Sequence, residues 1–527
     1  MQRRNFLRSM SMATVGGFTV RGFSNPMLAP LLNGVGEDRV LVVVQLYGGN
    51  DGLNTVIPID QYQLLSQFRS NVLVPETSVL PLSGTNGATG LHPRMTGMMD
   101  LWDDGKLAII QSVGYPDPNF SHFRSTDIWE TGSDANQLLD SGWAGRFLHF
   151  EYPNYPVGFP NTDMPDPLAI RVGGPIGPGL QHLGVSMGAA IYNTNDPLNL
   201  TNNIYTDPVT ADCKGGKLDF VRTVQRQTDL YGDVINAAAQ VGCNQSTMYP
   251  TGTQPGAQLA QALKVVAQLI CGGLKTKIYW VSDQGFDTHA QQTLTNDTTA
   301  GVHADLLQGV SDAIRAFQDD LQLLGLEDRV LGMTFSEFGR RVMSNASGGT
   351  DHGAAAPMVL FGTQVMPGLL GNNPTISPNT NFTTNLPMQY DFRSVYASVL
   401  RDWFCMAQAD VDTVLLNTYQ PLAVVDPDGC LGIGIHEANQ GSGTSLLEAW
   451  PNPFTDRTNL RFTSDGGRVA IHVFDEQGRV VRLVRNQDMP AGTHTVDVDL
   501  EDLPAGVYHC RLQNGRRLQV KDLLKVR

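Results

Sequence analysis

Val40-Leu41-Val42-Val43-Val44-Gln45-Leu46 is an uninterrupted, mostly β-branched run, and the glycine-rich segment Tyr47-Gly48-Gly49-Asn50-Asp51-Gly52 follows it directly. Such a run is typical of a strand that is buried on both faces of a sheet. The turn then places Asp51 at the carboxyl end of that strand, where open α/β sheets usually bind their ligands. Its glycines lack the spacing of a phosphate-binding loop. We therefore interpret Asp51 as a functional carboxylate rather than as a plain turn residue.

Strands and helices alternate along the chain from residue 39 to about residue 405. Apolar runs predict further strands at 107–112, 168–172, 277–281 and 330–335. Helical periodicity predicts helices at 93–102, 121–130, 257–271 and 303–324, one that begins at Trp143, and a last one that ends near Cys405. This alternation favours a three-layer α/β domain with a mostly parallel central sheet. Residues 151–255 have few periodic segments apart from a helical piece near 218–239, and they predict an insertion at the mouth of the pocket.

Acidic residues and histidines follow two more of these predicted strands. Asp287 and His289 lie two residues apart, so an extended loop points both side chains to the same side. Asp351 and His352 are predicted to lie in a glycine-bracketed loop, where they offer an oxygen and a nitrogen ligand to one cation. For each loop alone, a hydrogen-bonded turn is the alternative. Three such loops at equivalent strand ends favour a divalent metal site, and mixed oxygen and imidazole ligands suit Zn, Mn, Mg or Ca.

Ser121 lies at the predicted start of the helix 121–130. One interpretation is an ordinary N-cap, since a serine hydroxyl commonly caps the first turn of a helix. The other is a nucleophile, because the helix N-terminus and Arg124 would stabilise an anionic substrate there. The neighbouring His122 fits a ligand, an acid or a packing residue equally well.

Composition excludes several classes of protein. The chain has 527 residues, of which 41% are hydrophobic and 17% charged, as in globular proteins. Its net charge of −15 argues against a nucleic-acid partner, because the phosphate backbone of a nucleic acid binds to a basic protein surface. No run of about 18 apolar residues occurs, so we expect no membrane-spanning helix.

The N-terminus predicts an export signal and leader over residues 1–36. Arg3-Arg4-Asn5-Phe6-Leu7-Arg8 resembles the twin-arginine pattern, and a modestly apolar stretch from Met10 to Val20 follows it. The twin-arginine (Tat) translocase is then an expected partner, and the protein folds before it crosses the inner membrane. A basic amphipathic start without a targeting role is the alternative.

Export permits disulfides, and the chain has six cysteines. Cys213 and Cys243 lie in a polar, loop-like region and form the most plausible pair, while Cys405 with Cys430 is a second possibility. Cys271 follows an apolar helical pattern and is predicted to be a buried thiol. Cys510 stands alone in the C-terminal module.

Six stretches together resemble an exported bacterial family known as domain of unknown function 1501 (DUF1501), over residues 39 to about 410. They are Gly48-Gly49-Asn50-Asp51-Gly52-Leu53-Asn54, Asn119-Phe120-Ser121-His122-Phe123, Gly142-Trp143-Ala144-Gly145-Arg146, Phe286-Asp287-Thr288-His289, Ser336-Glu337-Phe338-Gly339-Arg340-Arg341 and Thr350-Asp351-His352-Gly353. That family is in turn similar to the alkaline phosphatase and sulfatase superfamily, whose members hydrolyse or transfer phosphate and sulfate esters.

The resemblance implies an order of site residues along the chain. The superfamily has an Asp after the first strand, a Ser, Thr or Cys nucleophile, an Asp with a nearby His, an Asp-His pair and a late His. The matching positions are Asp51, Ser121, Asp287 with His289, and Asp351 with His352. The superfamily spaces its Asp and His four apart, which makes Asp283 an alternative carboxylate. No His occurs between Gly353 and Ile435, so the late ligand is absent from its usual place.

The resemblance therefore predicts an alkaline-phosphatase-like domain over residues 37–430 that acts as an exported, metal-dependent hydrolase of phosphate esters. Sulfate esters are less favoured, because the sulfatase signature is absent around Ser121. A divalent cation held by Asp51, Asp351 and His352 would help to ionise Ser121, with Arg124 or Arg340 neutralising the equatorial oxygens. The alternative is a non-catalytic, phosphatase-like surface protein that binds an anionic glycan or lipid.

The character of the sequence changes after Cys430. Residues 431–448 are rich in Gly and Ser and predict a linker. Residues 449–527 predict a small all-β sandwich of short strands, with turns at 465–467 and 477–478. Pro451-Asn452-Pro453-Phe454, Phe474-Asp475-Glu476-Gln477-Gly478-Arg479, Leu503-Pro504-Ala505-Gly506-Val507-Tyr508 and the basic end resemble the C-terminal sorting domain of type IX secretion substrates.

That second resemblance implies the type IX secretion machinery as a partner. It also implies a secreted or outer-surface protein that is exported through the periplasm. A carbohydrate-binding sandwich is the alternative, but no aromatic platform is evident in the sequence.

Overall fold

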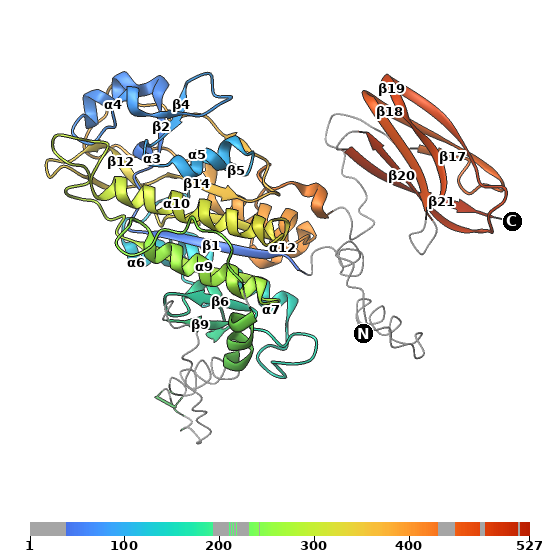
Figure 1. Cartoon of the computed structure of the whole chain (residues 1–527), viewed down its shortest axis with the longest axis horizontal. Helices are drawn as coiled ribbons and strands as arrows, with labels where there is room; N and C mark the ends of the chain where they lie inside the picture. The colour runs from blue at the N-terminus through green and yellow to red at the C-terminus, as the bar shows by residue number, and fades with distance from the viewer. Residues whose placement is uncertain are drawn as a thin grey trace. The chain divides into compact units, whose positions relative to one another are not determined.

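The computed structural model describes residues 38–192, 231–241, 243–430, 448–474, 480–514 and 517–526, with a few isolated positions between 209 and 219. The chain divides into two compact units, residues 1–433 and 434–527 (Figure 1). The predicted export signal (1–36) and nearly all of the predicted linker (431–448) lie outside the described residues.

A nine-stranded sheet forms the centre of the first unit. Its strands are β1 (Val40–Tyr47), β5 (Leu107–Gly114), β6 (Ala169–Val172), β9 (Ala189–Ile191), β10 (Ile278–Gln284), β11 (Val330–Phe335), β14 (Ala356–Phe361), β15 (Gly368–Leu370) and β16 (Tyr390–Asp391). The order is β15-β5-β14-β11-β1-β10-β6-β9, and β16 pairs with β5. The block β11-β1-β10-β6-β9 is parallel, whereas β14 runs antiparallel to β11 and β5. The prediction of a mostly parallel sheet is confirmed.

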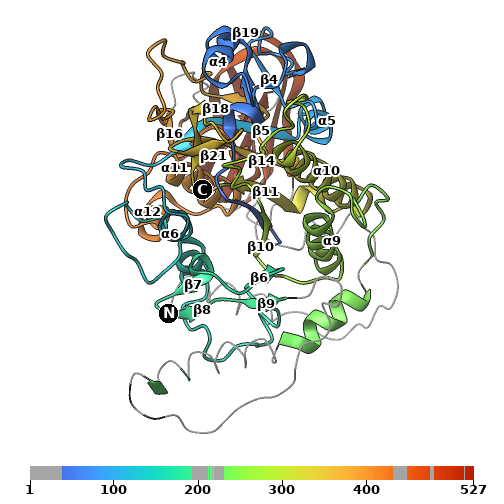
Figure 2. The same cartoon turned by 90° about the vertical axis from the view of Figure 1, so that its left-hand side faces the viewer.

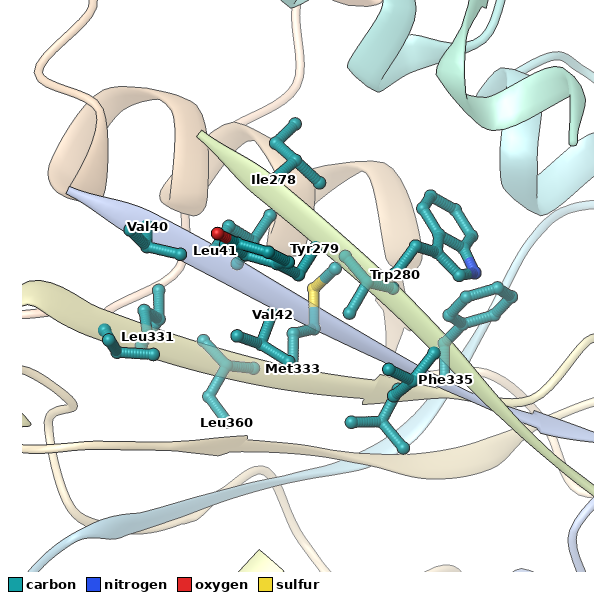
Figure 3. Packing of buried hydrophobic residues seen from close by; sticks show 14 of the residues in the cluster. Val40, Leu41, Val42, Ile278, Tyr279, Trp280, Leu331, Met333, Phe335 and Leu360 are labelled. Carbon is teal, nitrogen blue, oxygen red and sulfur yellow. The ribbon is translucent and has the colours of Figure 1, made fainter. Parts of the chain in front are cut away.

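Strand β1 lies in the middle of this sheet, and its apolar residues from Val40 to Val44 are at most 1% exposed. Figure 3 shows how Leu41 and Val42 pack with Tyr279 of β10 and Met333 of β11. Burial of each such side chain contributes about 1.5–3 kcal/mol. The β-branched run therefore occupies a central position of the sheet where both faces of the strand are covered, as they also are along β5 and β11.

Helices cover both faces of the sheet, which makes the three layers. Figure 2 shows α5 (Thr96–Asp103), α9 (Ala257–Cys271) and α10 (Val302–Leu323) on one side, and α6 (His122–Thr131), α11 (Phe392–Ser398) and α12 (Gln408–Leu415) on the other. Helix α7 (Trp143–Glu151) packs against α6 and α12. A π-helical turn, Val399–Trp403, continues α11 almost to the predicted end at Cys405. None of the described helices is long and apolar enough to cross a membrane.

Smaller elements decorate this domain. A three-stranded sheet of β2 (Val56–Pro58), β3 (Leu80–Pro81) and β4 (Thr89–Leu91) accompanies α3 (Gly52–Thr55) and α4 (Tyr62–Arg69). In the predicted insertion, β6 confirms the strand at 168–172, β7 (Gln181–His182) pairs with β8 (Val185–Ser186), and residues 231–241 are helical. Short 3-10 turns occupy Ile59–Gln61, Glu76–Ser78, Pro178–Leu180, Glu327–Arg329 and Pro427–Cys430.

Asp351 and His352 do not lie in a loop, and that prediction is wrong. They belong to β13 (Thr350–Gly353), which forms an antiparallel hairpin with β12 (Gly339–Ser344) and pairs His352 with Arg340. The Asn345 side chain accepts backbone N–H groups of Ser347 and Gly349, so it closes a tight turn between the strands. The flanking glycines therefore belong to a hairpin rather than to an open loop.

The disulfide predictions are partly wrong. Cys405 and Cys430 are bonded as predicted, and Cys510 is buried and free. Cys271, however, is not a free thiol, because it is bonded to Cys243. Gln268 of α9 donates to the carbonyl of Ala239, which holds the end of the 231–241 helix beside the end of α9. The predicted pairing of Cys213 with Cys243 is wrong, because Cys243 is bonded to Cys271. Cys213 itself lies outside the described residues.

The second unit is all-β, as predicted. It contains β17 (Glu448–Trp450), β18 (Arg457–Phe474), β19 (Val480–Asp499), β20 (Gly506–Asn514) and β21 (Arg517–Lys525) in one antiparallel sheet. The strands are longer than predicted, because β18 runs through the expected turn at 465–467 and pairs Gly467 with Met489 of β19. The turn predicted at 477–478 lies outside the described residues.

Candidate functional site

Three residues of the first unit could hold a metal ion together. His122 is the first residue of α6, Asp287 follows β10, and His352 lies on β13. Their ligand atoms all lie within 4.8 Å of one another. The Nε2 atom of His122 is 3.4 Å from Oδ2 of Asp287, and the Nε2 atom of His352 is 3.2 Å from Oδ1. We refer to His122, Asp287 and His352 as the ligand triad.

His289 adds a third imidazole beside the ligand triad. Its Nε2 atom lies 3.2 Å from Oδ1 of Asp287 and 2.9 Å from Nε2 of His352. Its Nδ1 atom lies 3.2 Å from Oδ1 of Asp351. The structure thus brings together Asp287, His289, Asp351 and His352, all of which the sequence suggested as metal ligands.

The second nitrogen of each ring faces a hydrogen-bond acceptor. His122 Nδ1 lies 2.7 Å from the Glu337 carboxylate, and His352 Nδ1 lies 2.8 Å from the carbonyl oxygen of Phe120. His289 Nδ1 has the Asp351 carboxylate as its partner. Because a carbonyl or a carboxylate can only accept, each ring nitrogen in these contacts has to present a hydrogen or lie beside a cation. The shorter contacts at Nδ1 of His122 and His352 favour the hydrogen of a neutral ring there, which leaves their Nε2 atoms, facing Asp287, to a second proton or a metal ion.

This arrangement fits a small cation. The Nε2 atoms of His289 and His352 are 2.9 Å apart, so either one ring donates a hydrogen to the other or a cation lies near both. Ligand atoms around a tetrahedral ion with bonds of about 2.0–2.1 Å are about 3.3 Å apart. His122 and His352 lie 3.4 and 3.2 Å from the two oxygens of the Asp287 carboxylate, which is close to that spacing. Two imidazoles and a carboxylate are also a ligand set found in catalytic zinc sites, which leave one position open.

Buried side chains support the triad from below. Arg340 is 1% exposed and donates to Oδ1 of Asp287 at 2.7 Å and to the carbonyl of Phe286 at 3.0 Å. The ring of Phe338 lies beneath both histidines of the triad, with centroid distances of 5.0 Å to His122 and 4.3 Å to His352. The β12–β13 hairpin and the start of α6 therefore both pack against the ring of Phe338.

The glycine pair of the β1 turn allows this packing. Gly48 has a φ of +127°, and a Cβ atom there would lie 2.2 Å from the amide nitrogen of Asp287. At Gly49, a Cβ atom would lie 2.3 Å from the ring of Phe338. A side chain at either position would push the turn away from the site.

Local electrostatics keep the two acids of the cluster ionised. Partial burial works to raise the pKa of Asp287, but hydrogen bonds from Arg340 and His352 outweigh it and bring the pKa to about 2. The amide of Asn345 lowers the pKa of Asp351. Burial lowers the pKa of His352, which favours its neutral, ligating form. The Asp287 side chain is 46% exposed, so the cluster opens to solvent.

Ser121 lies next to the cluster on the chain. It occupies the N-cap position of α6, but its side chain makes no capping hydrogen bond. The preceding carbonyl, of Phe120, binds His352, and the following residue is His122. The exposed Ser121 is thus flanked on both sides by residues that contact the triad.

Arg124 is engaged elsewhere. Its guanidinium forms an ion pair with Asp127 and donates to the carbonyls of Asp134 and Ala135 at 3.1 and 3.2 Å. The structure therefore ties Arg124 to the loop after α6, rather than placing it with His122 and Asp287.

Asp51 also lies outside the triad. It is fully buried, forms an ion pair with Arg69 of α4, and accepts a hydrogen bond of 2.6 Å from Gln292. Burial works to raise the pKa of Asp51, but the charge of Arg69 prevails and lowers it. Asp283, the alternative carboxylate, lies within β10, where burial raises its pKa to about 6.

Glu337 contacts the site, but the sequence alone did not indicate a role for it. It is fully buried, and it binds both His122 and the backbone N–H of Gly48. It lies two residues after the end of β11, just as other acidic residues follow β1 and β10. The same rule of acids at strand ends could therefore have found it.

Family models and solved structures provide the comparisons. The model described as "Protein of unknown function (DUF1501)" matches residues 223–415, and the model described as "Secretion system C-terminal sorting domain" matches residues 448–526. A search of curated proteins finds no match to this chain.

Similar solved structures include a sulfatase from Pseudoalteromonas sp., with 9% identity over 90% of this chain and 86% of that chain and a TM-score of 0.32. A protein in the alkaline phosphatase superfamily from Vibrio parahaemolyticus has 10% identity over 95% and 87%, with a TM-score of 0.30. The phosphonate monoester hydrolase from Silicibacter pomeroyi has 10% identity over 92% and 89%, with a TM-score of 0.32. At this level of similarity, the activities of those proteins do not carry over to this chain.

The family models agree with both resemblances found in the sequence, the DUF1501 model over residues 223–415 and the sorting-domain model over residues 448–526.

Proposed function

We propose that this chain is an exported, metal-dependent hydrolase of phosphate esters, with sulfate esters as poorer substrates. One observation carries the proposal, namely the convergence of the Nε2 atoms of His122, His289 and His352 on the Asp287 carboxylate, with every Nδ1 already bound to an acceptor. Imidazole nitrogens that all face acceptors need positive charge, which a bound metal ion or added protons supply. His122 also supplies an imidazole to a site in which the late histidine of the superfamily is absent.

His122, Asp287 and His352 would hold the ion, with His289 beside them. A bound divalent cation supplies Lewis-acid stabilisation of negative charge on a substrate oxygen. Arg340 keeps Asp287 ionised and oriented, and the acceptors on Nδ1 keep the histidine rings in place. Zinc suits this ligand set, and manganese is compatible with it.

Ser121 is the proposed nucleophile. Its hydroxyl would release its proton to solvent and its oxygen would form a bond to phosphorus while the ester O–P bond breaks, and the alcohol would leave with that electron pair and take up a proton from solvent. Water would then cleave the phosphoserine and restore the hydroxyl. The first N–H groups of α6 point toward the side on which Ser121 lies, and they favour a phosphate there.

The test uses the purified chain, stripped with a chelator and reloaded with Zn²⁺ or Mn²⁺. We expect hydrolysis of p-nitrophenyl phosphate, slower hydrolysis of p-nitrophenyl sulfate, and a loss of at least about 100-fold in Ser121→Ala. Ser66→Ala is the matched control, because Ser66 is an exposed serine of α4 that bonds only to a carbonyl of its own turn. Turnover that survives Ser121→Ala would remove the nucleophile, while metal-dependent binding of phosphate esters without turnover would favour the non-catalytic surface protein.

The sorting domain supports secretion to the cell surface through the type IX system. For the first step of export, we propose the twin-arginine route, on the pattern Arg3-Arg4-Asn5-Phe6-Leu7-Arg8. Replacement of both Arg3 and Arg4 by lysine is expected to retain the protein in the cytoplasm. Unchanged export of that variant would contradict this route.

A further inference from the structure

Glu337 is a buried carboxylate, and none of the described Lys or Arg side chains forms an ion pair with it. Its side chain is 0% exposed, and in the described part of the chain its partner in a charged contact is His122, at 2.7 Å. Its remaining hydrogen bonds come from the backbone N–H of Gly48 at 2.9 and 3.1 Å and from the hydroxyl of Ser336 at 3.4 Å. A buried carboxylate is costly unless a positive charge compensates it.

Among the residues that the structure describes, positive charge reaches Glu337 through the His122 ring. Glu337 accepts the Nδ1 hydrogen of His122, and the opposite nitrogen of that ring faces Asp287 at 3.4 Å. A carboxylate on the far side of a metal-ligating histidine fixes its tautomer and raises its basicity. The charge of Glu337 therefore strengthens the binding of a cation by His122 Nε2.

The same carboxylate also holds the β1 turn. Gly48 donates to Glu337, and the next contact of that turn is the N–H of Phe286, which donates to the carbonyl of Tyr47 at 3.1 Å. Phe286 directly precedes Asp287. Glu337 is thus linked to two members of the ligand triad, to His122 directly and to Asp287 through the turn.

We propose that Glu337 is a positioning residue that holds His122 in the tautomer with hydrogen on Nδ1 and thereby sets the affinity of the ligand triad for a divalent cation. This inference rests on the proposed function, because it assumes that the triad binds a metal ion. It assigns Glu337 no contact with substrate.

The direct test compares Glu337→Gln with Glu130→Gln. Glutamine keeps the size of the side chain and removes its charge. Glu130 is a matched control, since it is also buried and also accepts a hydrogen bond from a glycine N–H, that of Gly179 at 2.9 Å, but it does not contact the triad. We expect Glu337→Gln to weaken Zn²⁺ binding by about 10–100-fold in a chelator competition assay, and Glu130→Gln to leave it within about threefold. Equal affinities of Glu337→Gln and the wild type would overturn the inference.

A second measurement does not depend on how Glu337→Gln folds. In the metal-free wild type with ¹⁵N-labelled histidine, the nitrogen shifts of His122 report its tautomer, and His122→Gln identifies the signal. We expect the hydrogen on Nδ1, and a hydrogen on Nε2 would overturn the inference. A wild type that binds no divalent cation would instead contradict the proposed function, and the tautomer would still decide the role of Glu337.

Discussion

Asp51 and Asp287 follow two neighbouring parallel strands, β1 and β10, yet their surroundings are opposite. Asp51 is fully buried, and the guanidinium of Arg69 lies against it. Asp287 is half-exposed and faces the Nε2 atoms of three histidines, with Arg340 behind it. The first carboxylate has a cation from its own chain. The second also has one, Arg340, but it faces three imidazole nitrogens as well, and a metal ion that would bind them has to come from solution.

This difference predicts that Asp51 contributes mainly to the stability of the fold and Asp287 mainly to metal binding. A buried ion pair that loses one partner leaves an uncompensated charge in the interior, which is strongly destabilising. An exposed carboxylate among histidines is hydrated when it is empty, so its loss affects binding far more than folding. Substitutions at the two sites should therefore have effects of opposite kind.

The largest effect is expected for Arg69→Met, which leaves Asp51 buried and unpaired. We expect the free energy of unfolding to fall by about 3–5 kcal/mol in urea titrations. The double variant Asp51→Leu/Arg69→Met should recover much of that loss, because it removes both charges. Zn²⁺ bound per folded chain should not change in either variant. A loss of metal in folded Arg69→Met would show that Asp51 belongs to the metal site after all.

Asp287→Asn is expected to have the opposite profile. It removes the carboxylate on which the three imidazoles converge, so Zn²⁺ affinity should fall by at least about 100-fold. The free energy of unfolding of the metal-free protein should stay within about 1 kcal/mol of the wild type. Equilibrium dialysis and urea titration measure the two quantities. A strong loss of stability without loss of metal would reverse the roles assigned to Asp51 and Asp287.

The sequence was sufficient for much of the fold. Helix α9 and strand β11 begin and end where periodicity placed them, because long amphipathic or apolar segments depend little on distant contacts. The sequence could not separate Asp51 from Asp287, since both follow a strand. Arg69 distinguishes them, and it comes from α4, an amphipathic helix that carries no motif. The packing of α4 against β12 brings Arg69 to Asp51.

Lowering the pH should reduce the free energy of unfolding through His303, a buried histidine near Asp51. Burial lowers the pKa of His303 to about 4, although the charge of Asp51 opposes this shift, and Arg69 and Arg340 add to it. In the unfolded chain the pKa is about 6.5, so unfolding takes up a proton between these two values. Stability is therefore full above pH 6.5 and falls as the pH decreases toward 4. We expect a loss of about 2 kcal/mol between pH 7 and pH 5 from this group.

Urea titrations at several pH values measure that slope. His303→Gln should flatten it by the same amount, while His92, whose pKa burial lowers to about 3, continues to contribute. A wild-type protein equally stable at pH 5 and pH 7 would mean that His303 is protonated in the folded state.

The smallest effect is expected for Asp351→Asn, which tests the edge of the metal cluster. Among the described residues, the side chain of Asp351 contacts His289 rather than a member of the ligand triad, and it accepts a hydrogen bond from the Asn345 amide. An asparagine keeps an acceptor for His289 Nδ1, so the ring remains in place and loses only the carboxylate behind it. We expect Zn²⁺ affinity to fall by about 3–10-fold, less than for Glu337→Gln, because His289 adds to the ligand triad from one side. A loss as large as that of Asp287→Asn would make His289 a full ligand, and the site would then be a four-residue cage without an open position for substrate.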